Sequence, residues 1–281
     1  MTTFTERLWG VSRSKRSLVC VGLDPDPDLM AVPDVLEFNK AIIDATRDLV
    51  CAYKPNVAFY EALGRPGLDA LAGTVAYAHS VAPDVIVLGD AKRGDIASTN
   101  KMYARALFEV WGFDATTVNG YCGGEALEPF FEYEDRGSFV LCRTSNPGAT
   151  EIQDRELSEE NPPVLYYQYI ATRAREWNAR DNVGLVAGAT YPEDLGAVRA
   201  RCPGMPMLVP GVGSQSGDLG ASVRLGLDAD AFNLLVSSSR GIIYASRDPK
   251  DFADAARKAT GNLRDEINRI LEQEGRHWSE N

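Results

Sequence analysis

Four ionisable side chains lie within six positions after a short apolar run. Residues 85–88 are Val, Ile, Val and Leu, and they are followed by Asp90, Lys92, Arg93 and Asp95. Residues i and i+2 of a strand share a face, so Asp90 and Lys92 should point the same way. Charges taken out of water cost several kcal/mol each unless they are paired. The cluster is therefore either a salt-bridged loop or a set of groups arranged for chemistry.

The scarcity of histidine limits the chemistry that this cluster could perform. The chain contains two histidines, His79 in a predicted helix and His277 in a polar tail. A Ser-His-Asp triad or a histidine-rich metal site is therefore not expected. Acid–base work would fall to Lys, Asp, Glu or Tyr side chains.

Strand and helix patterns alternate along the chain and predict the elements that carry the cluster. Apolar runs predict strands at residues 17–23, 51–53, 85–88, 115–118, 139–142, 183–187, 207–209 and 231–235. Helices are predicted at residues 4–15, 39–50, 67–81, 98–111, 124–134, 163–180, 193–201, 216–227 and 248–274, the fourth with Ser98 or Thr99 as its N-cap. The acidic, proline-bracketed segment 146–162 is predicted to be a long loop of the kind that often forms a lid.

Eight strand–helix units in a chain of 281 residues favour an α/β fold, a single (β/α)₈ TIM barrel. We expect one barrel domain over residues 1–281, with a short N-terminal helix at about 4–15. It would end with a helix at about 248–274 and a polar tail.

Polar side chains at the expected strand ends would meet at one mouth of this barrel, where TIM barrels place their chemistry. They are Asp24, Lys54, Asp90 with Lys92, Asn119, Ser145, Gln215 and Arg240. Lys54 is then either a surface lysine or part of an alternating Lys-Asp-Lys-Asp array. Asp24 is either a turn residue or part of the mouth, and Ser145 either a turn serine or a hydroxyl that contacts a substrate amide edge.

The segments after the seventh and eighth expected strands predict a phosphate site. They read PGVGSQSGD and SSSRG, and barrel phosphate sites commonly use these two loops with backbone N–H groups at a helix start. Gly211 and Gly213 allow close backbone approach, and the Arg240 guanidinium can bind a phosphate with two parallel hydrogen bonds. Two glycine-bearing turns and a surface arginine are the alternative.

Composition restricts the partners and the compartment. The net charge of −11 argues against nucleic acid or an anionic membrane as the main partner. The five cysteines form no CxxC pair, and buried thiols in a reducing cytosol are expected. The N-terminus lacks the apolar core of a signal peptide, and no apolar run approaches the ~20 residues of a membrane span. We therefore expect a cytoplasmic protein.

Five segments together resemble the orotidine 5'-phosphate decarboxylase family. They are DAKRGDI at residues 90–96, which has the DxKxxD form, KPN at 54–56, RTSNPG at 143–148, PGVGSQ at 210–215 and SRGIIY at 239–244. The resemblance runs in order from about residue 17 to 246 and is strongest to the longer bacterial, mycobacterial-type branch. One departure is Gly120 after Asn119, where that branch has Pro, so Asn119 receives no role.

The resemblance implies a carboxy-lyase that converts orotidine 5'-monophosphate to uridine 5'-monophosphate and CO₂, the last step of de novo pyrimidine nucleotide synthesis, without metal or organic cofactor. Lys92 would protonate C6 of the pyrimidine, Asp90 would lie against the departing carboxylate, and Lys54 would complete the array. Lys54 and Asp24 would contact the ribose, and Ser145 the pyrimidine amide edge. The phosphate would be held by Gln215 and Arg240 with backbone help near Ser239, beside Pro210 and Gly211.

The resemblance also implies a homodimer with shared active sites. Asp95, with Ile96 and Thr99, would reach into the site of the partner subunit. The flanking Asp90 and Asp95 would favour a protonated Lys92.

Three alternatives remain open on the sequence. A metal-dependent sugar-phosphate decarboxylase or aldolase of the same barrel superfamily shares the central motif. A Schiff-base aldolase also has a lysine at a strand end, although that lysine must be deprotonated to react. A non-catalytic phosphate-binding barrel would leave the Asp-Lys-Asp cluster without a purpose.

Overall fold

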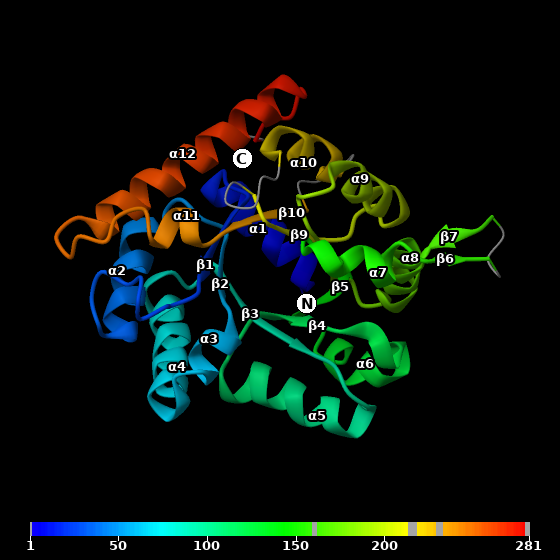
Figure 1. Ribbon diagram of the computed structural model, residues 1–281, viewed down its shortest axis with the longest axis horizontal. Helices are drawn as coiled ribbons and strands as arrows, with labels where there is room; N and C mark the ends of the chain where they lie inside the picture. Colours follow the sequence, from blue (N-terminus) through cyan, green and yellow to red (C-terminus); the bar gives the residue numbers. More distant parts are fainter. Residues whose placement is uncertain (1, 159–161, 213–217, 229–232, 279–281) are drawn as a thin grey trace.

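The computed structural model describes residues 2–158, 162–212, 218–228 and 233–278. Within them, eight parallel strands close into a barrel in the order β1-β10-β9-β8-β5-β4-β3-β2, surrounded by helices (Figure 1). The barrel strands are β1 (Val19–Leu23), β2 (Ala52–Pro55), β3 (Ile86–Arg93), β4 (Ala115–Val118), β5 (Gly137–Arg143), β8 (Val183–Ala187), β9 (Met207–Pro210) and β10 (Leu234–Ser238). The predicted TIM-barrel fold is confirmed.

The helices follow the strands around the outside of the barrel. The longer ones are α1 (Phe4–Lys15), α2 (Val35–Thr46), α4 (Gly64–Val81), α5 (Ala97–Arg105), α6 (Gly124–Phe131), α8 (Tyr166–Trp177), α9 (Pro192–Arg201), α10 (Leu219–Gly226) and α12 (Phe252–Gln273). Short turns are α3 (Val57–Glu61), the π-helix η1 (Ala106–Val110), the 3₁₀ turns η2 (Gly120–Cys122) and η3 (Pro147–Ala149), α7 (Thr150–Gln153) and α11 (Arg240–Ile243).

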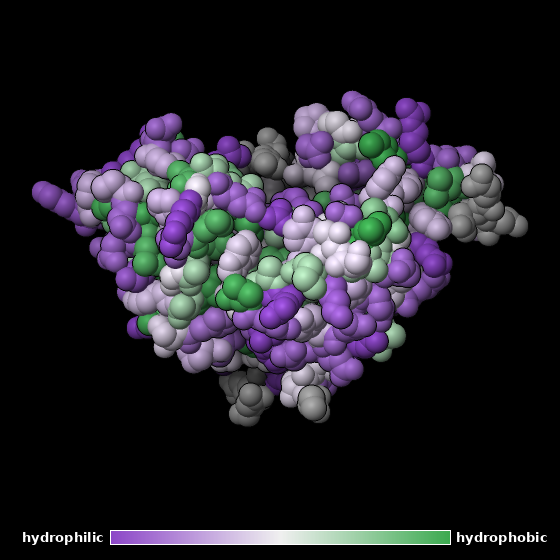
Figure 2. Space-filling model, turned by 90° about the horizontal axis from the view of Figure 1, so that it is seen from below, coloured by the Kyte–Doolittle hydropathy of each residue, from purple (hydrophilic) through white to green (hydrophobic). Residues whose placement is uncertain are grey.

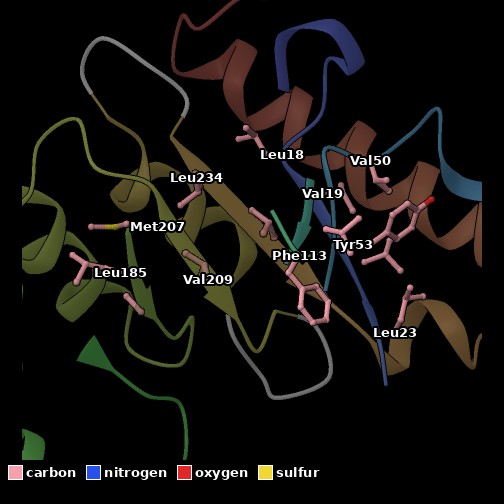
Figure 3. Packing of buried hydrophobic residues seen from close by; sticks show 14 of the residues in the cluster. Leu18, Val19, Leu23, Val50, Tyr53, Phe113, Leu185, Met207, Val209 and Leu234 are labelled. Carbon is pink, nitrogen blue, oxygen red and sulfur yellow. The ribbon is translucent and has the colours of Figure 1, made fainter. Parts of the chain in front are cut away.

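Two hydrophobic cores result from the alternation of side chains along the strands. The larger lies between the barrel and its helices and includes Val19 of β1, Tyr53 of β2 and Val209 of β9, which are labelled in Figure 3. The smaller lies inside the barrel, where Phe4 of α1 packs edge-on against Phe139 of β5 at 6.0 Å between ring centroids. Helix α1 therefore closes the N-terminal end of the barrel and leaves the opposite mouth open for chemistry.

Two strand predictions need correction. Strand β3 extends from Ile86 to Arg93 rather than ending at residue 88, because Arg93 pairs with Val118 beyond a shift in register. Strand β10 begins at Leu234, three residues later than the expected 231–235, of which residues 231–232 lie outside the described residues. Asn233 directly precedes the strand, and its side-chain amide donates to the Gly204 carbonyl at 2.6 Å.

The segment 146–162 is not the plain loop that the sequence predicted. It contains η3, α7 and β6 (Glu156–Leu157), which pairs antiparallel with β7 (Val164–Leu165). Helix α8 accordingly begins at Tyr166 rather than residue 163, and Asn178, its C-cap, accepts hydrogen bonds from the backbone N–H groups of Asn182 and Val183. The β6–β7 hairpin and the Asn178 cap are held by specific hydrogen bonds between nearby residues, which the apolar pattern of the sequence does not reveal.

Helix starts also differ from expectation where caps decide them. Helix α2 begins at Val35, before the expected residue 39, because the Asp34 carboxylate accepts from Glu37 N at 2.9 Å. Helix α5 is capped at Ile96 rather than at Ser98 or Thr99.

The Asn100 side chain fixes the turn before α5. It donates to the Asp95 carbonyl at 2.7 Å and accepts from Asp95 N at 3.0 Å. A side chain inside the helix thus replaces the N-cap hydroxyl that the sequence predicted.

The cysteine prediction holds for four of the five thiols. Cys20, Cys51, Cys142 and Cys202 are buried, whereas Cys122 in η2 is exposed. No helix in the described part of the chain has the length and apolar composition needed to cross a membrane.

Candidate active site

The alternation of side chains along the strands places a ring of polar side chains at the open mouth of the barrel. On β2, β3, β4 and β10, interior core residues are followed two positions later by side chains of the same face. These are Lys54, Asp90, Thr117 and Ser237, all of them buried. The hydrophobic interior thus ends in a polar layer, with solvent on the other side.

Asp90 lies at the centre of this layer, between two ammonium groups. Lys54 Nζ is 3.1 Å from Asp90 Oδ2, and Lys92 Nζ is 2.6 Å from Asp90 Oδ1. Thr117 Oγ1 donates to the same Oδ1 at 2.8 Å. The structure therefore brings the sequence-predicted Asp90, Lys54 and Lys92 together, and adds a hydroxyl that the sequence did not single out.

Burial and neighbouring charges set the protonation states of Lys54 and Asp90, the inner pair of the array. Burial of Lys54 disfavours its charge, but the carboxylates of Asp90 and Asp24 outweigh burial and raise the pKa of the ammonium. Burial also disfavours a charged Asp90, yet Lys54 and Lys92 together hold the pKa of that carboxyl well below its usual range. Both groups are therefore charged at neutral pH, which supplies fixed charges at the base of the mouth.

A cavity of about 440 Å³ extends from the array to the ends of β9 and β10. Asp24, Pro210, Gly211, Ser239 and Arg240 line it together with Lys54 and Asp90. Oδ1 of Asp24 is buried without a hydrogen-bond partner in the described structure. Because an unsatisfied buried oxygen is costly, Asp24 is poised to accept a hydrogen bond from a hydroxyl of a ligand in this cavity.

Arg240 lines the same cavity. It is the first residue of α11, exposed, and preceded by Ser239 at the N-cap. Strand β1 approaches Ser239 closely because residue 22 is a glycine. A Cβ added at Gly22 would lie 1.8 Å from Ser239 Oγ. Gly211 has φ +92°, a conformation that favours glycine. Gly213 and Gln215, also predicted for the phosphate site, lie outside the described residues.

A second cavity of about 380 Å³ adjoins the first and shares Lys54, Asp90 and Pro210 with it. It is lined in addition by Lys92, Ser145 and an apolar wall of Leu141, Val186 and Leu208. A flat, mostly apolar ring with a polar edge fits such a space, with Lys92 on one side and Ser145 on another.

Ser145 is held close to the end of β8 by a glycine. A Cβ added at Gly188 would lie 2.9 Å from Ser145 Cβ and 3.0 Å from its backbone N. Gly188 N also donates to the Arg143 carbonyl at 2.8 Å. The ends of β5 and β8 therefore need a residue without a side chain at position 188.

Comparisons with known proteins identify the family of this chain. Residues 17–256 match the model of the family described as orotidine 5'-phosphate decarboxylase / HUMPS. The chain belongs to that family. It is 51% identical over 278 residues to an orotidine 5'-phosphate decarboxylase of Thermomicrobium roseum, covering 96% of this chain and 97% of the relative.

Solved structures of the family show the same fold. The structure of Leishmania donovani OMP decarboxylase superposes with a TM-score of 0.82 at 40% identity, over 95% of this chain and 98% of that one. The structure of Leishmania donovani UMP synthase gives 0.84 at 40% identity, over 96% of this chain and 57% of that longer chain.

Three residues that the decarboxylase resemblance singled out lie outside both cavities. Asp95 and Ile96 are exposed and Thr99 is half-buried, all at the start of α5. Neither cavity, as lined by the described residues, includes them. Within one subunit the structure therefore does not bring them to the array.

Arg93 of the central motif and Asn119, which was predicted at a strand end, have local structural partners. Arg93 pairs with Glu61 and stacks over the Tyr103 ring, so it turns away from the array. Asn119 caps η2 by accepting from Tyr121 N at 3.1 Å. Neither contributes to the cavities formed by the described residues.

Sequence reasoning missed several residues of this candidate site. Tyr244 joins the segment after α11 to the segment after β1, since its hydroxyl donates to the Asp24 carbonyl and accepts from Asp26 N, each at 2.7 Å. Phe59 of α3 forms an apolar wall of the larger cavity. Thr117 was detectable, because it stands two positions after Ala115 on an inward face. Tyr244 ends the SRGIIY segment but received no role there, and Phe59 carried no local signal.

Proposed function

We propose that this chain is a carboxy-lyase that converts orotidine 5'-monophosphate to uridine 5'-monophosphate and CO₂ without a cofactor. The observation that carries the proposal is the array itself, in which one buried carboxylate lies between two ammonium groups at the junction of two cavities. Membership of the family supports the choice of substrate.

The array suits a reaction that develops negative charge at one carbon. Loss of CO₂ from C6 of the pyrimidine leaves a carbanion with little resonance stabilisation, so the site must stabilise charge and supply a proton. Lys92 serves both purposes when its ammonium lies near C6, because preorganised charge acts strongly in a closed site. Asp90 holds Lys92 in place and lies against the departing carboxylate.

The remaining residues divide between the two cavities. The apolar-walled cavity would hold the pyrimidine, with Ser145 at its amide edge. Asp24 and Lys54 would hold the ribose hydroxyls, which gives the orphaned Asp24 Oδ1 a partner. Arg240, with Gln215 and the backbone near Pro210, Gly211 and Ser239, would hold the phosphate. Binding energy from this distant phosphate is then available to stabilise the transition state at C6.

We further propose a homodimer in which Asp95, Ile96 and Thr99 complete the partner's site. Ile96 and Met102 are 61% and 54% exposed, although apolar side chains are usually covered. Green hydrophobic patches interrupt the polar surface in the view from below (Figure 2). A second copy of the chain covering the start of α5 would bury these side chains and bring Asp95 to a second array.

The test is the loss of orotidine 5'-monophosphate absorbance on incubation with the protein in excess EDTA. Rapid conversion to uridine 5'-monophosphate supports both the reaction and its independence from metal. No conversion with EDTA, but turnover of a sugar phosphate when magnesium is restored, would replace the proposal with the metal-dependent decarboxylase that the sequence left open.

A further inference from the structure

We propose that Thr117 is a positioning residue for the array, and that its single hydroxyl fixes both the Asp90 carboxylate and the backbone of Lys92. The inference rests on the proposed function, since only there does the array have a catalytic meaning. It concerns a residue of β4 that no substrate atom needs to touch.

The hydroxyl of Thr117 makes two hydrogen bonds at once. Thr117 Oγ1 donates to Asp90 Oδ1 at 2.8 Å and accepts from Lys92 N at 2.9 Å. A hydroxyl has one proton to donate and lone pairs to accept, so both bonds form together. The side chain is 1% exposed, and water does not compete for either bond.

The backbone of Lys92 needs this support. Lys92 has φ +48°, a left-handed conformation that side-chain-bearing residues rarely adopt. The β3–β4 pairing shifts in register between Gly89 and Arg93, and at this irregularity Lys92 N bonds to a side-chain hydroxyl. Strained conformations persist only where their surroundings fix them. In this conformation Lys92 Nζ lies 2.6 Å from Asp90 Oδ1.

The Asp90 carboxylate needs a neutral partner as well as charged ones. Oδ2 receives Lys54, whereas Oδ1 receives Lys92 and Thr117. Thr117 is anchored on a barrel strand, so it fixes the rotation of the carboxylate even when Lys92 moves toward substrate. Without it, both lysines would follow a carboxylate that turns more freely, and small misplacements are costly to the chemical step.

Thr116 offers a matched control on the same strand. Its side chain is fully buried, and Oγ1 donates to the Gly89 carbonyl at 2.9 Å. Because neighbouring strand residues face opposite sides, this hydroxyl bonds β3 without approaching the array. Thr116→Val therefore removes a buried threonine hydroxyl that bonds the same two strands without contacting a charged group.

The experiment compares steady-state decarboxylation by the wild type, Thr117→Val, Thr117→Ser and Thr116→Val, each checked for folding by thermal unfolding. Thr117→Val should lower kcat by about tenfold or more while KM changes by less than about threefold. Thr117→Ser keeps the hydroxyl and should restore kcat to within about threefold of wild type, and Thr116→Val should stay within that range too. Thr117→Ala replaces Thr117→Val if the latter does not fold.

Two results would overturn the inference. One is a kcat of the folded Thr117→Val protein equal to that of Thr116→Val, and the other is a Thr117→Ser protein as slow as Thr117→Val. An inactive wild type would instead be a failure of the proposed function. In that case crystal structures of the variants decide, because the inference requires the Lys92 backbone or the Asp90 carboxylate to move in Thr117→Val and not in Thr116→Val.

Discussion

Replacing Lys54 with methionine tests whether the buried half of the array also stabilises the fold. The two charges of the inner pair are 3.1 Å apart, with side chains only 6% and 9% exposed. At an effective dielectric constant of about 20, Coulomb attraction at that distance is about 5 kcal/mol. Desolvation offsets part of this, and breaking one side of a buried pair typically costs about 3–5 kcal/mol.

The expected loss of stability in Lys54→Met depends on Lys92, the partner that Asp90 keeps. Asp90 keeps Lys92 at 2.6 Å, although the Lys92 side chain is 48% exposed. We therefore expect the free energy of unfolding to fall by about 3 kcal/mol, the lower end of the range. Lys92→Met is the matched control, and its half-exposed pair should contribute less than about 1 kcal/mol.

Urea unfolding, carried out at one protein concentration, measures the free energy of unfolding of both variants, and equal m values make these free energies comparable. The pKa of Asp90 is lowered by folding, so its contribution is present above the unfolded pKa of about 3.9 and is lost as pH falls through the folded value. The pKa of Lys54 is raised, so its contribution is present below about 10.4 and is lost as pH rises through the folded value. The difference between wild type and Lys54→Met should therefore be constant from about pH 5 to 9. An equal loss in Lys92→Met, or a loss below about 1 kcal/mol in Lys54→Met, would refute this reasoning.

Three further predictions concern the proposed substrate contacts. Arg240→Ala should raise KM by a factor equivalent to about 2–5 kcal/mol, and an unchanged KM would remove Arg240 from the phosphate site. Mixed Lys92→Ala and Asp95→Ala proteins should regain decarboxylase activity, because one site of the heterodimer has both native residues; heterodimers without activity would contradict the shared site. Gly188→Ala should displace Ser145 and lower kcat/KM by about tenfold. Gly10→Ala, where no atom lies within 4 Å of an added Cβ, is its control, and equal kinetics in the two would count against the close fit at Ser145.

The sequence predicted the barrel because its strands are short apolar runs between helical segments, which is a local signal. It also predicted that Asp90 and Lys92 lie on one side, and both reach the same array, although through a left-handed Lys92 that strand periodicity does not foresee.

Local sequence patterns did not predict contacts between residues that are distant in the sequence. Buried Arg143 is held by Asp154 at 2.9 Å and Asp194 at 2.8 Å, and it stacks on Tyr191. These contacts tie the segment after β5 to α9, so tertiary pairing, rather than composition, gives that segment its short helices and hairpin.

Two measurements on Lys92→Ala test the central claim most directly. They are its rate of decarboxylation and its affinity for uridine 5'-monophosphate. An ammonium about 4 Å from the carbanion contributes about 4 kcal/mol at an effective dielectric constant of about 20, which corresponds to a rate factor of about 10³. Proton delivery adds about 10²–10⁴. The account predicts that turnover is lost while product binding remains measurable. A near-native kcat in this variant would contradict the assignment of Lys92 as the proton donor.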